Sequence, residues 1–77
     1  MNNAIINGFR LKDLLNILDA RATVSIYAGI NPNDNIKNTF KVYELLADKD
    51  FIEAYGKREV KGLVSFINVT NILIEEV

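Results

Sequence analysis

The chain has 77 residues, which is enough for one domain spanning 1–77 and too few for a second. It contains no histidine and no cysteine, which excludes the commonest general base, the commonest nucleophile, disulfides and thiolate metal sites. The net charge is −1, with nine basic and ten acidic residues, so we expect no general affinity for nucleic-acid phosphates.

The first eight residues carry neither a basic region nor a long apolar stretch, and no apolar run approaches the ~20 residues of a membrane span. We therefore expect no signal peptide, no membrane contact and a location in the bacterial cytoplasm. Ten asparagines and ten isoleucines, both encoded by AT-rich codons, indicate an AT-rich source such as a low-GC bacterium or its phages.

The first predicted element is an amphipathic helix that runs from about Leu11 to Asp19. Its apolar face consists of residues spaced three and four apart: Leu11, Leu14, Leu15 and Leu18. The preceding Asn7-Gly8 pair is compatible with a type I′ hairpin or with a simple turn into the helix, and we favour the turn.

A strand is predicted over 22–28, where Val24 and Ile26 alternate with polar residues. The strongest loop signal follows over 29–35, which holds the only proline and a dense cluster of Asn and Asp residues, and the loop is predicted to span 29–38. A second extended segment is predicted over 39–42.

The period becomes ambiguous over 43–55, which fits either a continued strand or a helix. Asp48 or Asp50 is a suitable cap for a short helix, and Gly56 a suitable stop. Two further strands are predicted over 58–67 and 72–77.

A turn at 68–71 separates these last strands, and Gly62 indicates a bulge, a bend or a close backbone approach. The order of elements predicts an α+β domain with an N-terminal amphipathic helix. A curled antiparallel sheet of about four strands follows, with the short helix inserted between strands 2 and 3.

The polar loop is the first candidate binding surface, because binding residues often lie on loops. Tyr27 and Tyr43 flank it with a parity opposite to the predicted core faces, and exposed tyrosines are good interface anchors. Partial burial under the short helix is the alternative for both. The predicted partner-binding residues are Tyr27, Asn31, Asn33, Asp34, Asn35 and Tyr43.

The only basic cluster is Lys57, Arg58 and Lys61, beside Tyr55. Basic residues next to an aromatic side chain are typical of sites for single-stranded nucleic acid or phosphate. Glu59 interrupts the cluster, so a solvated strand start is the simpler interpretation. Helix capping and a solvated strand end account for the carboxylates, and we predict no catalytic residue, no metal site and no cofactor.

Several short stretches carry a pattern that runs from Leu11 to the end of the chain. They are Leu11-Lys12-Asp13-Leu14-Leu15, Val24-Ser25-Ile26-Tyr27, Tyr43-Glu44-Leu45, Val60 and Leu73-Ile74-Glu75-Glu76. In these stretches the chain resembles short uncharacterised proteins encoded by phages, prophages and conjugative elements of low-GC Gram-positive bacteria. The resemblance implies an accessory product of a mobile element, a group that includes inhibitors of host defence such as inhibitors of CRISPR nucleases.

The sequence therefore predicts a non-catalytic binding protein of a phage or mobile element that acts on a host protein, such as a component of a defence system. One alternative is a nucleic-acid-binding accessory module that uses the basic cluster. The other is a small self-assembling structural subunit, because an exposed sheet edge in a small apolar domain favours a homo-oligomer.

Overall fold

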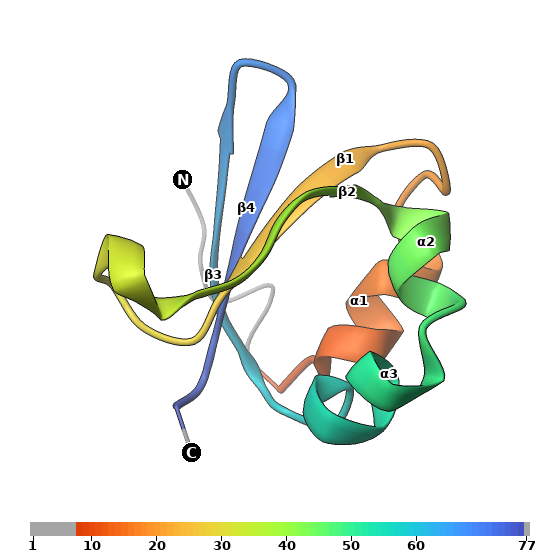
Figure 1. Cartoon of the computed structure of the whole chain (residues 1–77), viewed down its shortest axis with the longest axis horizontal. Helices are drawn as coiled ribbons and strands as arrows, with labels where there is room; N and C mark the ends of the chain where they lie inside the picture. The colour runs from red at the N-terminus through yellow and green to blue at the C-terminus, as the bar shows by residue number, and fades with distance from the viewer. Residues whose placement is uncertain (1–7, 77) are drawn as a thin grey trace.

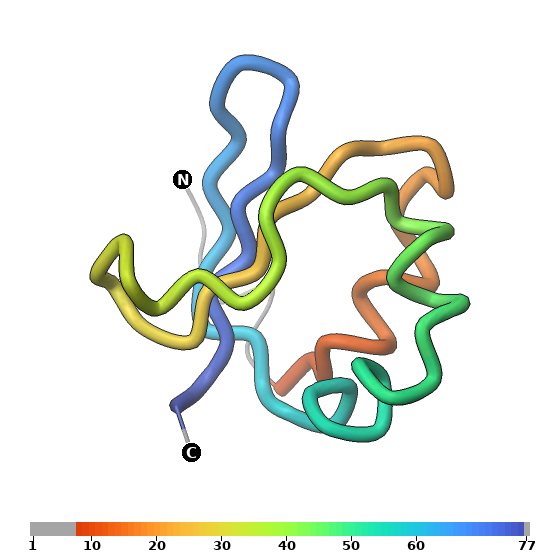
Figure 2. The backbone as a smooth tube through the Cα atoms, in the orientation of Figure 1, coloured from red at the N-terminus to blue at the C-terminus, as the bar shows by residue number. Residues whose placement is uncertain are grey.

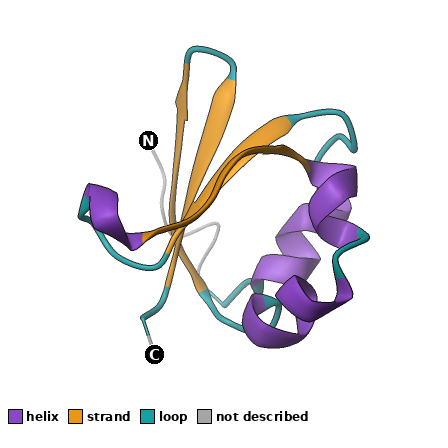
Figure 3. Cartoon of the chain, viewed as in Figure 1, coloured by secondary structure: helices purple, strands orange, loops and turns teal. Residues whose placement is uncertain are grey.

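Three α-helices pack against one face of a four-stranded mixed sheet in the computed structural model, which describes residues 8–76 (Figure 1). The helices are α1 (Leu11–Ile17), α2 (Val42–Leu46) and α3 (Lys49–Tyr55). The strands are β1 (Thr23–Tyr27), β2 (Asn35–Lys41), β3 (Val60–Phe66) and β4 (Val69–Ile74), arranged in the order β2-β1-β4-β3. Figure 3 shows the three α-helices gathered on one side of the strands, apart from the short 3₁₀ turn formed by Pro32–Asp34. The α+β class is thus confirmed.

The first helix forms where the leucine spacing predicts it, with Leu11, Leu14 and Leu15 buried. It ends at Ile17, two residues before the predicted end, because Leu18 is extended and the Asp19 carboxylate accepts a hydrogen bond from the backbone N–H of Arg21 at 2.9 Å. It is not N-terminal, since ten residues precede it. Asn7 of the predicted Asn7-Gly8 turn lies outside the described residues.

The sheet is mixed, so the predicted all-antiparallel sheet is wrong. Two antiparallel hairpins, β1–β2 and β3–β4, are joined by α2 and α3, and β4 inserts beside β1 in parallel register from Thr23↔Val69 to Tyr27↔Leu73. Local patterns predict hairpins, whereas the helical connection decides which strands of the two hairpins meet.

The predicted loop over 29–38 is too long, because β2 already begins at Asn35. Within the loop, Pro32–Asp34 forms one turn of 3₁₀ helix, η2. Backbone pairing with β1 overrides the weak strand preference of asparagine. A register shift follows, with Thr39 at φ 63, and the buried Ser25 hydroxyl accepts the Thr39 N–H at 2.9 Å.

The ambiguous segment 43–55 is helical, but it holds two short helices where one was predicted. Asp48 caps α3 by accepting the Phe51 N–H at 3.1 Å, and Gly56 follows its end. In the last hairpin the turn is Ile67–Asn68 and β4 already starts at Val69, so the predicted turn at 68–71 is misplaced. A two-residue turn between two long strands occupies so few residues that its position is hard to locate in the sequence.

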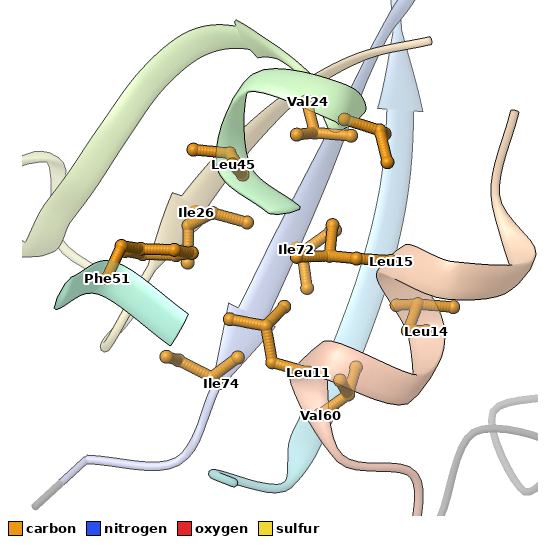
Figure 4. Packing of buried hydrophobic residues seen from close by; sticks show 11 residues of the cluster. Leu11, Leu14, Leu15, Val24, Ile26, Leu45, Phe51, Val60, Ile72 and Ile74 are labelled. Atoms are coloured by element: carbon orange, nitrogen blue, oxygen red, sulfur yellow. The ribbon is translucent and has the colours of Figure 1, made fainter. Parts of the chain in front are cut away.

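The core lies between the helices and the sheet (Figure 4). Each strand in contact with the helices contributes residues of one parity, as period-2 alternation requires. The buried apolar side chains are Leu11, Leu14, Leu15, Val24, Ile26, Val42, Leu45, Phe51, Val60, Ile72 and Ile74. Among residues 8–76, no helix is long and apolar enough to cross a membrane.

Candidate functional site

The asparagine-rich loop uses much of its polarity to hold its own shape. The Asp34 carboxylate accepts the backbone N–H of Asn31 at 3.1 Å, and the Asn31 carbonyl accepts the Asp34 N–H at 2.9 Å. A Cβ at Gly29 would overlap the Asp34 carboxylate in its present position, so the glycine allows this close approach. Asn31 and Asn33 are exposed and remain available to a partner.

Asn35 belongs to the sheet rather than to the loop. Its side-chain amide donates to the Ile26 carbonyl at 3.2 Å and to the Lys37 carbonyl at 3.0 Å. Both bonds support the irregular pairing between β1 and β2. The amide protons of Asn35 are therefore engaged inside the protein.

The two predicted tyrosines lie at opposite ends of β1. Tyr27 pairs with Asn35 at the loop end, while the Tyr43 N–H bonds the Ala20 carbonyl at 3.0 Å near the start of the strand. A five-residue strand separates these ends by about 13 Å. The structure thus brings Tyr27 to the loop and leaves Tyr43, which is 55% exposed, on the helical side.

Two of the three side chains in the basic cluster have partners within the protein. The Arg58 guanidinium lies 4.6 Å from the centre of the Tyr55 ring, and the Lys61 ammonium pairs with Glu59 at 3.3 Å. Lys57 is exposed and its carbonyl accepts a bond from the Arg10 guanidinium. The Glu59 carboxylate also accepts the Gly8 N–H, and this bond together with Lys61 lowers the pKa of Glu59. The nucleic-acid alternative remains a prediction, and the Glu59 carboxylate lies within the basic cluster that it would use.

A second surface is more distinctive, and of its residues the sequence predicted only Tyr27 as partner-binding. We call it the open face: the side of the sheet away from the helices, formed by Tyr27, Ile30, Gly62, Val64, Phe66 and Leu73. Val64 and Phe66 are 64% and 67% exposed, and Ile30 in the adjoining loop is 88% exposed. The β3–β4 hairpin that carries much of this face projects beyond the rest of the fold (Figure 2).

The projecting hairpin has one polar and one apolar side, and the apolar side is the one that faces away from the core. Its side that continues the core face is polar near the tip, where Ser65 and Thr70 pair with their hydroxyls 3.4 Å apart. Its other side carries Val64 and Phe66. All thirteen residues from Gly62 to Ile74 are uncharged. A hairpin that served only as a solvated extension would have polar residues on both sides.

The turn of this hairpin is strained. Ile67 and Asn68 have φ 48 and 64, the left-handed geometry of a type I′ turn. Asparagine tolerates this region, whereas a β-branched residue there costs roughly 1–2 kcal/mol. Ile67 is also 76% exposed, so a strained apolar residue stands at the tip.

A groove of about 390 Å³ crosses the open face. It is lined by Tyr27, Ile30, Gly62, Val64, Asn71 and Leu73, among others. A smaller hollow of about 220 Å³ shares Gly29, Ile30 and Leu73 with it and continues to Lys61, Glu75 and Glu76. The groove is thus an apolar depression, and the charged side chains line the adjoining hollow.

The sequence holds a signal for this surface. The uncharged stretch from Gly62 to Ile74 stands out in a chain with 25% charged residues, and Val64 and Phe66 share a parity that Leu63 does not. Comparison with known proteins finds no matching family model, no matching curated protein and no matching solved structure. Within residues 8–76, no three acidic side chains are grouped closely enough to hold a metal ion.

Proposed function

We propose that the protein is a non-catalytic binding module that contacts another protein through the open face. The observation that carries this proposal is the placement of exposed Val64 and Phe66 on the side of the hairpin that the helices leave uncovered. Polar Ser65 and Thr70 lie on the other side of the hairpin. Burial of one such apolar side chain contributes about 1.5–3 kcal/mol. A few of them suffice as anchors of an interface.

The strained turn supports the same role. Backbone strain is tolerated where the rest of the structure holds it, and such residues cluster at functional sites. Ile67 extends the apolar surface to the tip of the hairpin at the expense of turn stability. The tip, Phe66 and Ile30 then form successive contacts along one surface.

Affinity capture with matched variants tests the surface. We expect Phe66→Ser or Ile30→Ser to weaken capture of a protein partner about 10- to 100-fold, since each removes one buried anchor. Ile17→Ser is the control, because Ile17 is 66% exposed on α1, away from the open face. Loss of capture with Ile17→Ser, or full capture with both open-face variants, would refute the assignment.

The resemblance to proteins of phages and mobile elements adds a class of partner to this proposal: a host protein, such as a component of a defence system. Expression of the chain in a host with an active defence system should then protect an infecting phage. Phe66→Ser should abolish protection and Ile17→Ser should retain it. Equal protection by both variants would separate any anti-defence activity from the open face.

A further inference from the structure

Among residues 8–76, the outer edge of β3 is covered only at its beginning. The Val60 N–H donates to the Phe9 carbonyl at 2.8 Å, and Arg10 forms a bridge with Glu59. Within the described part of the chain, no strand pairs with the outer edge from Gly62 to Phe66. We call these five residues the free edge.

The free edge presents backbone hydrogen-bonding groups at two residues. A two-residue turn is closed by a hydrogen-bonded pair, here Phe66 and Val69, and bonding alternates from there along an antiparallel ladder. Phe66 and Val64 therefore direct their backbone groups toward β4. Leu63 and Ser65 direct theirs outward.

We propose that a second copy of this chain pairs with the free edge, antiparallel, about a two-fold axis that passes beside Val64. In this register Leu63 of each copy lies opposite Ser65 of the other, and their outward groups form four N–H···O bonds. Val64 then faces its own copy across the axis in a non-hydrogen-bonded pair, where side chains approach most closely.

The same register places the Phe66 side chain of one copy beside the space above Gly62 of the other. Phe66 of one copy lies opposite Gly62 of the other, and both positions belong to the open face. Gly62 leaves its part of the groove unfilled, and the nearest atom to a Cβ built there is the Leu73 Cβ at 3.8 Å. An aromatic ring from the neighbouring strand can therefore cover the glycine and contact Leu73 without a clash. Cross-strand cover of an edge glycine by an aromatic ring is a known stabilising device in sheets.

Charge favours this edge over the opposite one. The free edge carries no charge, so two copies meet without repulsion between like charges. The other edge, β2, carries Lys37 and Lys41 and is broken by register shifts, which are features that protect edge strands from pairing. The free edge of β3 therefore favours pairing with a second copy, and the β2 edge disfavours it.

This inference rests on the proposed function, because it gives part of the open face a defined partner. A two-fold axis perpendicular to the sheet keeps the helices of both copies on the same side. The two open faces then adjoin, so Tyr27, Ile30 and Ile67 of both copies remain available to another protein. Dimerisation and partner binding are consequently separable.

Disulfide trapping tests the register directly, because the chain has no cysteine. Non-hydrogen-bonded pairs hold their Cα atoms about 4.5 Å apart, which lies within the range that disulfides span. We expect Val64→Cys to give a covalent dimer rapidly under mild oxidation, and Ile17→Cys, with similar exposure, to give it only slowly. Equal rates for the two variants would overturn the register.

Light scattering at several concentrations gives the second measurement. The pairing is smaller than a standard interface, so we expect a concentration-dependent dimer. Val64→Lys should be monomeric, whereas Ala54→Lys, which adds the same charge on the exposed side of α3, should still dimerise. A wild-type chain that is monomeric at all concentrations overturns the proposal. If removal of residues 2–7 then produces dimers, the free edge is occupied by the chain's own N-terminal segment.

Partner capture distinguishes failure of this inference from failure of the proposed function. A monomeric chain whose capture still depends on Ile30 would retain the binding role and lose the dimer. A dimer trapped through Val64→Cys, with capture insensitive to Ile30→Ser, would retain the dimer and lose the binding role.

Discussion

The two faces of the sheet both carry apolar residues, but the helices cover one face and leave the other exposed to solvent. On the helical face Val24, Ile26 and Ile72 are completely buried, whereas on the open face Val64 and Phe66 are about two thirds exposed. Apolar residues on the first face determine the fold, because removal of their surface from water is the main stabilising force. Those on the second face contribute little to folding, which leaves them free to contact another molecule.

Neighbouring residues of β4 give the largest expected difference between the faces. Ile72→Ala should lower the free energy of unfolding by about 2–5 kcal/mol, because it opens a cavity in the core. Leu73→Ala, which points to the open face and is half-buried, should lower it by less than about 1.5 kcal/mol. Urea denaturation of both variants measures the contrast. Equal losses would mean that both faces stabilise the fold alike.

The strained turn gives an effect of intermediate size and opposite sign. Ile67→Gly should raise the free energy of unfolding by roughly 1 kcal/mol, because glycine adopts the positive φ without strain. The same change should weaken partner capture, since it removes the apolar tip. Asn68→Gly is the control, as asparagine already tolerates this conformation. A destabilised Ile67→Gly protein would show that the turn is not strained.

The smallest effect concerns pH and belongs to the helical side. The Phe51 N–H, assisted by Lys37, lowers the pKa of Asp48, so the ionised carboxylate stabilises the fold above its unfolded pKa. This stabilisation is lost as the pH falls through the lowered pKa of the folded state. Asp48→Asn should therefore melt slightly below the wild type at pH 7 and approach it below pH ~4. A gap that persists into strong acid would assign the effect to packing.

Periodic patterns predicted the local elements well and the pairing of distant ones poorly. The leucine spacing in α1 and the alternation in β1 reflect direct contact with a single core, so these elements were found. The parallel contact between β1 and β4 depends on how α2 and α3 return the chain, which no local pattern encodes. Asn35 was assigned to a loop because its composition gave no sign of the backbone pairing that holds it in β2.

In the candidate site, too, the sequence predicted some features and missed those that depend on the folded structure. Asn31 and Asp34 were selected for their polarity, yet the structure engages the Asn31 backbone and the Asp34 carboxylate with each other. Aromatic side chains usually lie in a core, so no sequence pattern indicated that Phe66 would be exposed. Phe66 is exposed because it lies on the open face, and a strand pattern alone does not reveal which face of a sheet is covered.

Site-specific photo-crosslinking in living cells tests the central claim most directly. A photoreactive phenylalanine derivative at position 66 and, in a second strain, at position 17 would report which of two similarly exposed sites touches another protein. We predict discrete protein adducts from position 66, either with a second copy or with a different partner, and only background from position 17. Equal background from both positions would contradict the assignment of the open face as an interaction surface.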